Sequence, residues 1–91
     1  MAQKGQQMSP MKILRSAINK QVMVKTKDGF EYVGRLAMTD STMNVVIEDA
    51  TEFADDGKRI VAKYDRILIR GSQILFICVD YTEAMMRQSV K

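Results

Sequence analysis

The sequence has no histidine, one cysteine and one proline among its 91 residues. Without histidine, and with Cys78 as the single thiol, the usual ligand sets for zinc, copper or non-haem iron cannot be assembled. A serine or cysteine nucleophile would also have no histidine to act as its base. No glycine-rich phosphate-binding loop is present. These absences argue against an enzyme and predict neither a metal nor a cofactor.

One group of carboxylates could still attract a divalent cation, because its members are close in sequence: Asp49, Glu52, Asp55 and Asp56. Gly57 and Lys58 follow the group directly. Glycine and aspartate at such a position are typical of turns. We therefore prefer a solvated hairpin loop to a metal site.

Long apolar runs are also missing. No run approaches the roughly 20 residues of a membrane-spanning helix, and the start Met-Ala-Gln-Lys-Gly lacks the apolar core of a signal peptide. Cys78 lies in an apolar stretch and is expected to be a buried small hydrophobe in a reducing compartment. We expect a cytoplasmic protein without a membrane partner.

The composition that remains is that of one small globular domain. Hydrophobic residues make up 46% and charged residues 27%, which is not the balance of a disordered chain. The net charge of +3 permits an anionic partner but does not require one, since much of it can be ordinary solvated surface.

Helical spacing is confined to the start of the chain. Residues 1–8 are polar and expected to be flexible. Ser9-Pro10 then supplies an N-cap followed by proline at the first helical position. Apolar residues recur at helical spacing up to a C-cap at Asn19, so the sequence predicts a short helix over residues 10–18.

From Gln21 onward the apolar residues alternate with period two, which is typical of strands. Asp28-Gly29 indicates a tight hairpin, and Gly34 indicates a bend or a close backbone approach within the second strand. The expected strands cover residues 21–27, 30–38, 43–50, 59–69 and 73–79. The sequence therefore predicts a mainly β fold, in which a short N-terminal helix precedes a five-stranded, strongly bent antiparallel barrel.

The last two strands are apolar on both faces, over residues 67–69 and 74–79. An antiparallel sheet with one wet face should alternate, and apolar open edges invite aggregation. Pairing of the fourth strand of one copy with the fifth strand of the next would cover these surfaces and could close into a ring. A tail helix from Tyr81 to Val90 is an alternative cover, and both could hold together.

Two polar segments interrupt the strand pattern, at residues 40–44 and 70–72. Asn44 can both donate and accept hydrogen bonds toward a base edge, with Asp40 close enough to orient it. Arg70 offers a flat cation, and Gly71 allows backbone to come close to whatever Arg70 covers. These residues predict a base-reading pocket, and two ordinary polar turns are the alternative.

Taken together, these segments resemble the Sm and Sm-like (LSm) family of RNA-binding proteins. Residues 22–29 and 31–36 are similar to the first half of the first Sm motif, residues 40–50 to its second half, and residues 69–77 to the second motif. The compact single domain looks most like the archaeal members. The resemblance implies a domain over residues 9–80, with residues 81–91 as a tail that could be helical. It also implies six- or seven-membered rings that bind uridine-rich single-stranded RNA.

The resemblance assigns the pocket residue by residue. Asp40 matches the orienting acid, Asn44 the base-reading amide and Arg70 the arginine that covers the base. Backbone near Gly71 and Ser72 would approach the base edge. Seven copies at +3 each would bring about +21 to one ring, which favours phosphate. The implied role is an RNA chaperone or scaffold in RNA processing.

The sequence departs from the family pattern at two positions. The family often has an aromatic residue or histidine where this chain has Thr42, and threonine cannot stack on a base, a contact worth about 1–3 kcal/mol. Gln73 stands where asparagine is more usual. Met43, by the same match, points into the core. The bacterial Sm-like RNA chaperone is a poorer match, because its Tyr-Lys-His type of second motif is absent. A structural ring without base recognition is therefore the competing hypothesis.

Overall fold

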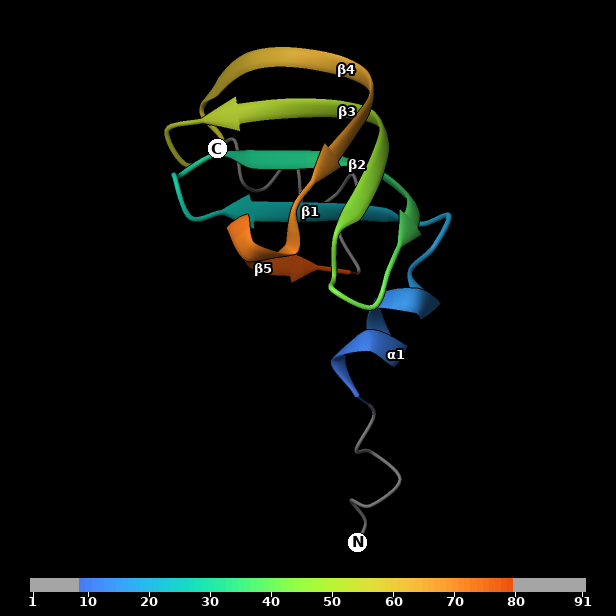
Figure 1. Ribbon diagram of the computed structural model, residues 1–91. Coiled ribbons are helices and arrows are strands. Elements are labelled where there is room, and N and C mark those ends of the chain that lie inside the picture. Colours follow the sequence, from blue (N-terminus) through green and yellow to red (C-terminus); the bar gives the residue numbers. More distant parts are fainter. Residues whose placement is uncertain (1–8, 80–91) are drawn as a thin grey trace, which may run out of the picture.

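The computed structural model describes residues 9–79, which form one short helix and one bent antiparallel sheet (Figure 1). The elements are α1 (Pro10–Ser16), β1 (Gln21–Thr26), β2 (Glu31–Thr39), β3 (Val45–Ala54), β4 (Arg59–Ile69), the 3₁₀ turn η2 (Gly71–Gln73) and β5 (Ile74–Cys78). The predicted mainly β fold with an N-terminal helix is confirmed. The predictions for residues 1–8 and for the tail over 81–91 lie outside the described residues.

Helix α1 begins as its sequence predicts. The Ser9 hydroxyl accepts a hydrogen bond from the Lys12 backbone N–H at 3.1 Å, with proline at the first helical position. The helix ends at Ser16, two residues earlier than predicted, and a turn follows. Asn19 adopts a left-handed φ of 75° and donates its backbone N–H to the Leu36 carbonyl at 2.7 Å. Leu14 of α1 and Ala17, which caps the helix, are buried, so this side of the helix packs on the sheet.

Strand β1 alternates as predicted, with Val22, Val24 and Thr26 buried on one face. A four-residue turn follows it, in which Gly29 has a φ of 97° and donates its N–H to the Thr26 carbonyl at 3.0 Å. The buried faces of the strands and of α1 meet in one apolar core. Its buried members are Leu14, Ala17, Val22, Val24, Leu36, Val45, Ile47, Ala50 and Ile69.

The sheet bends where two strands break their regular register. Gly34 is buried in β2 at one such break, and a Cβ there would lie 2.6 Å from the Ile47 side chain and 2.7 Å from the Glu48 carbonyl oxygen. The predicted close backbone approach at Gly34 is therefore confirmed. In β3, Asp49 has a φ of 53°, which shifts the buried face from Ile47 to Ala50. Because the alternation resumes beyond this bulge, β3 runs to Ala54, four residues past the predicted end.

The predicted hairpin loop of four carboxylates is correct only for Asp55 and Asp56, which adopt left-handed φ values beside Gly57. Asp49 and Glu52 belong to β3 instead. Glu52 is 7% exposed, because the shifted alternation turns its side chain inward. Within residues 9–79, no group of three or more potential ligands is placed to hold a metal ion.

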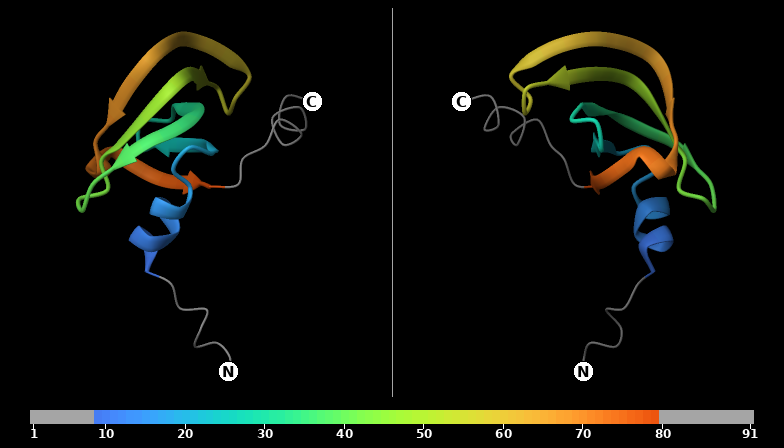
Figure 2. Two further views of the ribbon diagram at one scale, coloured as in Figure 1. Left: turned by 90° about the vertical axis from the view of Figure 1, so that its right-hand side faces the viewer. Right: turned by 60° about the vertical axis from the view of Figure 1, so that its left-hand side comes forward.

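The sheet order is β4-β3-β2-β1-β5, so the two strands that are apolar on both faces form its two ends. Figure 2 shows β3 and β4 arching over the remaining strands, with β5 at the opposite end of the same sheet. Large apolar side chains are exposed on these end strands, with Leu68 at 62%, Leu75 at 58% and Phe76 at 49%. Within residues 9–79 the sheet is thus open, and its edges are apolar.

Candidate functional site

The two polar segments predicted to form a pocket meet at one end of the molecule. One is the loop between β2 and β3, and the other is the turn η2 after β4. Gly71 lies so close to the loop that a Cβ would collide with the Thr42 carbonyl oxygen and lie 3.0 Å from the Met43 carbonyl carbon. Glycine at position 71 is therefore what allows the two segments to touch.

Asp40 holds the β2–β3 loop in shape. Its Oδ1 atom accepts hydrogen bonds from the Thr42 backbone N–H at 2.9 Å, the Thr42 hydroxyl at 2.8 Å and the Asn44 backbone N–H at 3.1 Å. Its Oδ2 atom accepts from the Asn44 side-chain amide at 3.0 Å. The hydrogen bonds from Thr42 and from Asn44 favour the charged form and lower the pKa of the Asp40 carboxyl.

Asn44 joins the loop to η2. Its Nδ2 donates to Asp40 Oδ2 and to Thr42 Oγ1, each at 3.0 Å, while its Oδ1 accepts the backbone N–H of Gly71 at 2.8 Å. The Asn44 carbonyl is fixed as well, since it accepts from the Thr39 hydroxyl at 3.0 Å. The amide is therefore held in one orientation, at the contact between the loop and η2.

Met43 takes a left-handed φ of 65°, which points its side chain in a different direction from those of Thr42 and Asn44. Its side chain packs against the apolar core, as the family resemblance implies. Asn44 is half-buried and Thr42 exposed. The strained backbone at Met43 thus lets one loop anchor itself in the core and still present polar groups to solvent.

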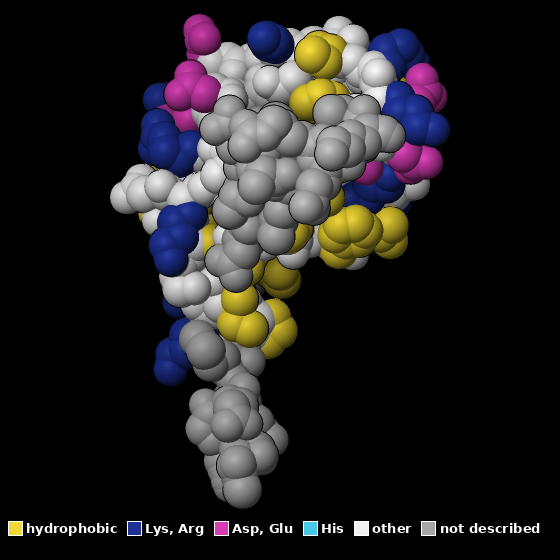
Figure 3. All heavy atoms as spheres, turned by 180° about the vertical axis from the view of Figure 1, so that it is seen from behind, with side chains coloured by type: hydrophobic (Ala, Val, Ile, Leu, Met, Phe, Trp, Pro, Cys, Tyr) yellow, Lys and Arg dark blue, Asp and Glu magenta, His cyan; other side chains and the backbone are white. Residues whose placement is uncertain are grey.

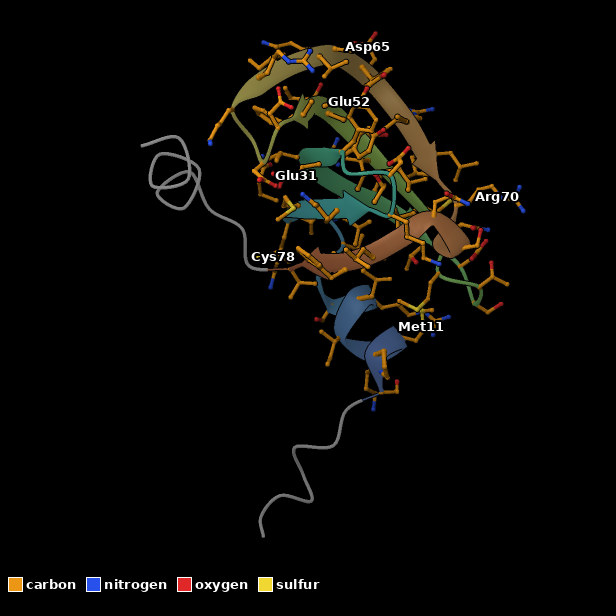
Figure 4. All side chains as sticks on the ribbon, turned by 90° about the vertical axis from the view of Figure 1, so that its left-hand side faces the viewer. Met11, Glu31, Glu52, Asp65, Arg70 and Cys78 are labelled. Carbon is orange, nitrogen blue, oxygen red and sulfur yellow. The ribbon has the colours of Figure 1, made fainter. Side chains whose placement is uncertain are left out.

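Arg70 and Ser72 are exposed on the η2 side of this contact. Figure 4 shows Arg70 at the end of β4, extending away from the strands. Its backbone precedes η2 in an extended conformation, with φ −71° and ψ 138°. The structure brings Asp40, Thr42, Asn44 and Gly71 into one hydrogen-bonded group, and it places Arg70 and Ser72 beside that group rather than in it.

Behind the loops lies an apolar hollow of about 360 Å³, between α1 and β5. Met43 and Gly71 line it on the loop side, Ile13 and Leu14 on the helix side, and Phe76 on the strand side. Figure 3 shows hydrophobic side chains reaching the surface where the helix joins the body of the molecule. Sequence reasoning predicted apolar strands here but not a hollow, because periodicity does not report how helix and strand are spaced.

Sequence reasoning also missed two contacts. From the sequence, Thr42 was expected only to lack the ring that would stack on a base. The two hydrogen bonds of its hydroxyl could not be predicted from the spacing of residues along the chain. The buried carboxylate of Glu52 was assigned to a loop, although Tyr32 and Tyr64, whose hydroxyls donate hydrogen bonds to it, lie in predicted strands.

Within residues 9–79 no helix is long and apolar enough to cross a membrane.

Comparison with known proteins agrees with these features. The family model of the LSM domain matches residues 12–79. An snRNP Sm-like protein of Pyrococcus horikoshii is 43% identical over 68 residues, which cover 75% of this chain and 88% of that protein. The corresponding protein of Thermoplasma acidophilum is 37% identical over 68 residues, covering 75% and 80% of the two chains.

Solved structures give the same result. The Pyrococcus abyssi Sm protein, determined in complex with a uridine heptamer, superposes with a TM-score of 0.73 at 37% identity, covering 78% of this chain and 97% of the other. A chain of the SmAP1 heptamer from Pyrobaculum aerophilum superposes with a TM-score of 0.70 at 33% identity, covering 79% of this chain and 93% of the other. The family model matches most of this chain, and the two Sm-like relatives above are 43% and 37% identical to it. This chain therefore belongs to the Sm-like (LSm) family.

Proposed function

We propose that this protein assembles into a closed ring of six or seven subunits and binds uridine-rich single-stranded RNA, as a chaperone or scaffold in RNA processing. The observation that carries the proposal is Asn44, an amide oriented by Asp40 and joined to Gly71 at a half-buried contact between the β2–β3 loop and η2. An amide locked in this way is suited to reading a base edge. We further propose a cytoplasmic location, where Cys78, a free thiol in this structure, would stay reduced.

The open ends of the sheet support the ring. Strands β4 and β5 each have one edge without a partner strand within residues 9–79, and both expose large apolar side chains. Pairing of β4 with β5 of the next copy would satisfy both edges in a heterologous contact, which can close by rotation. The P. aerophilum relative is a heptamer, which supports the same assembly here.

A ring would also gather the proposed binding groups. One Asn44 and one Arg70 from each copy would recur around the assembly, so weak single sites would act together on one RNA strand. Unstacked bases of single-stranded RNA can enter separate pockets. The complex of the P. abyssi relative with a uridine heptamer supports uridine as the base, and Arg70 would cover its face.

Titration of oligouridine and oligocytidine at two salt concentrations tests the base-reading role. Asn44→Ala should remove the preference for uridine while leaving the salt dependence nearly unchanged, because Asn44 neutralises no phosphate. Arg70→Lys keeps the charge but loses the planar group, so it should weaken binding nearly as much as Arg70→Ala.

Lys58→Ala is the matched control, because Lys58 is an exposed cation in the turn between β3 and β4, outside the two loops of the proposed site. This variant should bind oligouridine like the wild type. Wild-type binding by Arg70→Lys, together with retained uridine preference in Asn44→Ala, would show that the ring only attracts phosphate.

Native mass spectrometry of the intact protein tests the assembly and gives the ring number. We expect six or seven copies and no stable monomer at micromolar concentration. Leu75→Pro should break the ring or the fold, because proline removes a strand donor from β5. A monomeric wild type under these conditions would contradict the ring.

A structural or protein-interaction ring without base recognition is the second candidate. The observation that favours it is Thr42, which is exposed, cannot stack on a base and spends its hydroxyl on Asp40 and Asn44. This candidate predicts an assembled wild-type ring that binds oligouridine and oligocytidine equally weakly. The titrations above separate the two candidates.

A further inference from the structure

We propose that Thr42 is a positioning residue that leaves Asn44 only an acceptor for the base, so that the pocket selects bases presenting an imino N–H. The inference rests on the proposed function, because it concerns how the same pocket would choose its base. It assigns to Thr42 a role that does not depend on stacking. The argument follows from counting the hydrogen bonds of the Asn44 amide.

A primary amide has two N–H donors and an oxygen with two lone pairs. In this structure both donors of Asn44 are used, one on Asp40 Oδ2 and one on Thr42 Oγ1, each at 3.0 Å. One lone pair of Asn44 Oδ1 accepts the Gly71 N–H at 2.8 Å. The group that Asn44 can still offer to a ligand is therefore the second lone pair of its oxygen.

The direction of each hydrogen bond is fixed by chemistry. The ionised Asp40 carboxylate only accepts, so the Thr42 hydroxyl must donate to it across 2.8 Å. The hydroxyl oxygen is then free to accept from Asn44. Turning the amide over would point its oxygen at two acceptors and its N–H groups at the Gly71 N–H. The Asp40–Thr42–Asn44 group therefore holds a single amide orientation.

An acceptor-only amide distinguishes pyrimidines by their N3 atom. Uracil carries a hydrogen on N3, which can donate to Asn44 Oδ1. Cytosine has a lone pair at the same position, which would face the Asn44 oxygen without a hydrogen between them. Discrimination then comes from the unpaired acceptors as much as from the hydrogen bond that uracil gains. The uracil O4 atom needs no contact with Asn44.

The first test uses the free ring and needs no RNA. In a full-length, ¹⁵N-labelled and deuterated sample, the side-chain amide of Asn44 should give two slowly exchanging proton signals. Thr42→Val removes the hydroxyl at nearly constant shape and should expose one of these protons to faster exchange. Thr42→Ser restores the hydroxyl and should restore slow exchange. Equal exchange in wild type and Thr42→Val would overturn the positioning role.

The second test uses binding by assembled rings. Thr42→Val leaves one N–H of Asn44 without its acceptor, so that a small tilt of the whole amide can offer this N–H to the N3 lone pair of cytosine. Its preference for oligouridine over oligocytidine should fall by about fivefold per occupied pocket, the size of one hydrogen bond. Thr42→Ser should keep the wild-type preference, and unchanged preference in Thr42→Val would contradict the proposal.

Modified RNA separates this inference from the proposed function. Wild-type rings should bind oligo-N3-methyluridine no better than oligocytidine. They should bind oligo-4-thiouridine, which keeps N3–H, nearly as well as oligouridine. Loss of preference with 4-thiouridine would show that Asn44 reads O4 and would overturn the acceptor-only role, although uridine recognition itself would stand. Equal weak binding of all four oligomers would instead overturn the proposed function, with the exchange test still deciding the role of Thr42.

Discussion

Two carboxylates, Asp40 and Glu52, each collect hydrogen bonds from two other residues, but in different surroundings. Asp40 lies on an exposed loop and binds Thr42 and Asn44, which are two and four residues away. Glu52 lies on β3 with 7% of its surface exposed. It accepts from the Tyr32 hydroxyl at 3.1 Å and from the Tyr64 hydroxyl at 2.5 Å. The first group is local, whereas the second links β2, β3 and β4.

The pKa shifts follow this difference. Hydrogen bonds from Thr42 and Asn44 lower the pKa of Asp40. Burial, together with the bond to Glu52, raises the pKa of the Tyr32 hydroxyl, and the bond to Glu52 raises that of Tyr64. An exposed carboxylate can order a loop at little gain in stability, while a buried one must be fully paired and so fixes the strands around it.

The largest effect is expected from Glu52→Ala. The change leaves the half-buried Tyr32 hydroxyl and the Tyr64 hydroxyl without their acceptor. It should lower the free energy of unfolding by about 2 kcal/mol, since each lost hydrogen bond contributes about 1 kcal/mol. Chemical denaturation at a fixed subunit concentration measures this, because ring assembly makes stability concentration-dependent. Oligouridine affinity of the folded ring should stay unchanged, because Glu52 is not among the residues of the loop contact.

Glu48→Ala is the control from the same strand. Glu48 forms ion pairs with Arg35 and Arg66, and the Arg66 side chain is 71% exposed. Surface pairs of this kind contribute less than about 1 kcal/mol. Equal destabilisation by Glu48→Ala and Glu52→Ala would mean that the two tyrosine hydrogen bonds add little.

Gly71→Ala should have a smaller effect on stability and a larger one on binding. The added Cβ would meet the backbone of Thr42 and Met43, so the loop and η2 must separate, at a cost of about 1–2 kcal/mol. The hydrogen bond from the Gly71 N–H to Asn44 Oδ1 should be lost, and oligouridine binding in titrations should fall with it.

Gly29→Ala provides the comparison, because Gly29 has a left-handed φ of 97° and open space around its Cβ position. That change should cost a similar free energy of unfolding, here as backbone strain instead of a steric clash, without altering RNA binding. Wild-type oligouridine affinity in Gly71→Ala would show that the loop contact is not needed for recognition.

Elements with one buried face could be predicted well from the sequence. The alternation of Val22, Val24 and Thr26 gave the buried face of β1, and Ser9-Pro10 gave the start of α1. The end of β3 could not be predicted, because the bulge at Asp49 reverses the alternation without a glycine or proline to announce it. For the same reason Glu52 was read as a loop residue.

The proposed site shows a similar limit. The residue types at Asp40, Asn44 and Gly71 left two ordinary polar turns as an alternative, and it was the family resemblance that assigned the two segments to one pocket. The direction of the Thr42 hydroxyl was not predictable, because it depends on where three side chains lie after folding. Sequence patterns specify which groups are brought together, while hydrogen-bond geometry decides what each group can still offer a ligand.

The smallest effect on stability is expected when low pH protonates Asp40, and this test sharpens the contrast between the two carboxylates. The pKa of Asp40 is lower in the folded protein than in the unfolded chain. Its contribution is therefore fully present above the ordinary aspartate pKa and is lost as the pH falls through the lowered value. Slow exchange of the Asn44 side-chain amide should persist below pH 4, near the unperturbed value of about 3.9, and disappear at still lower pH while β-sheet circular dichroism remains. Asp40→Asn should show fast exchange already at neutral pH. If slow exchange of the Asn44 amide and the β-sheet circular dichroism are lost together at one pH, the loop is not an independently ordered unit. The division of roles between Asp40 and Glu52 would then be wrong.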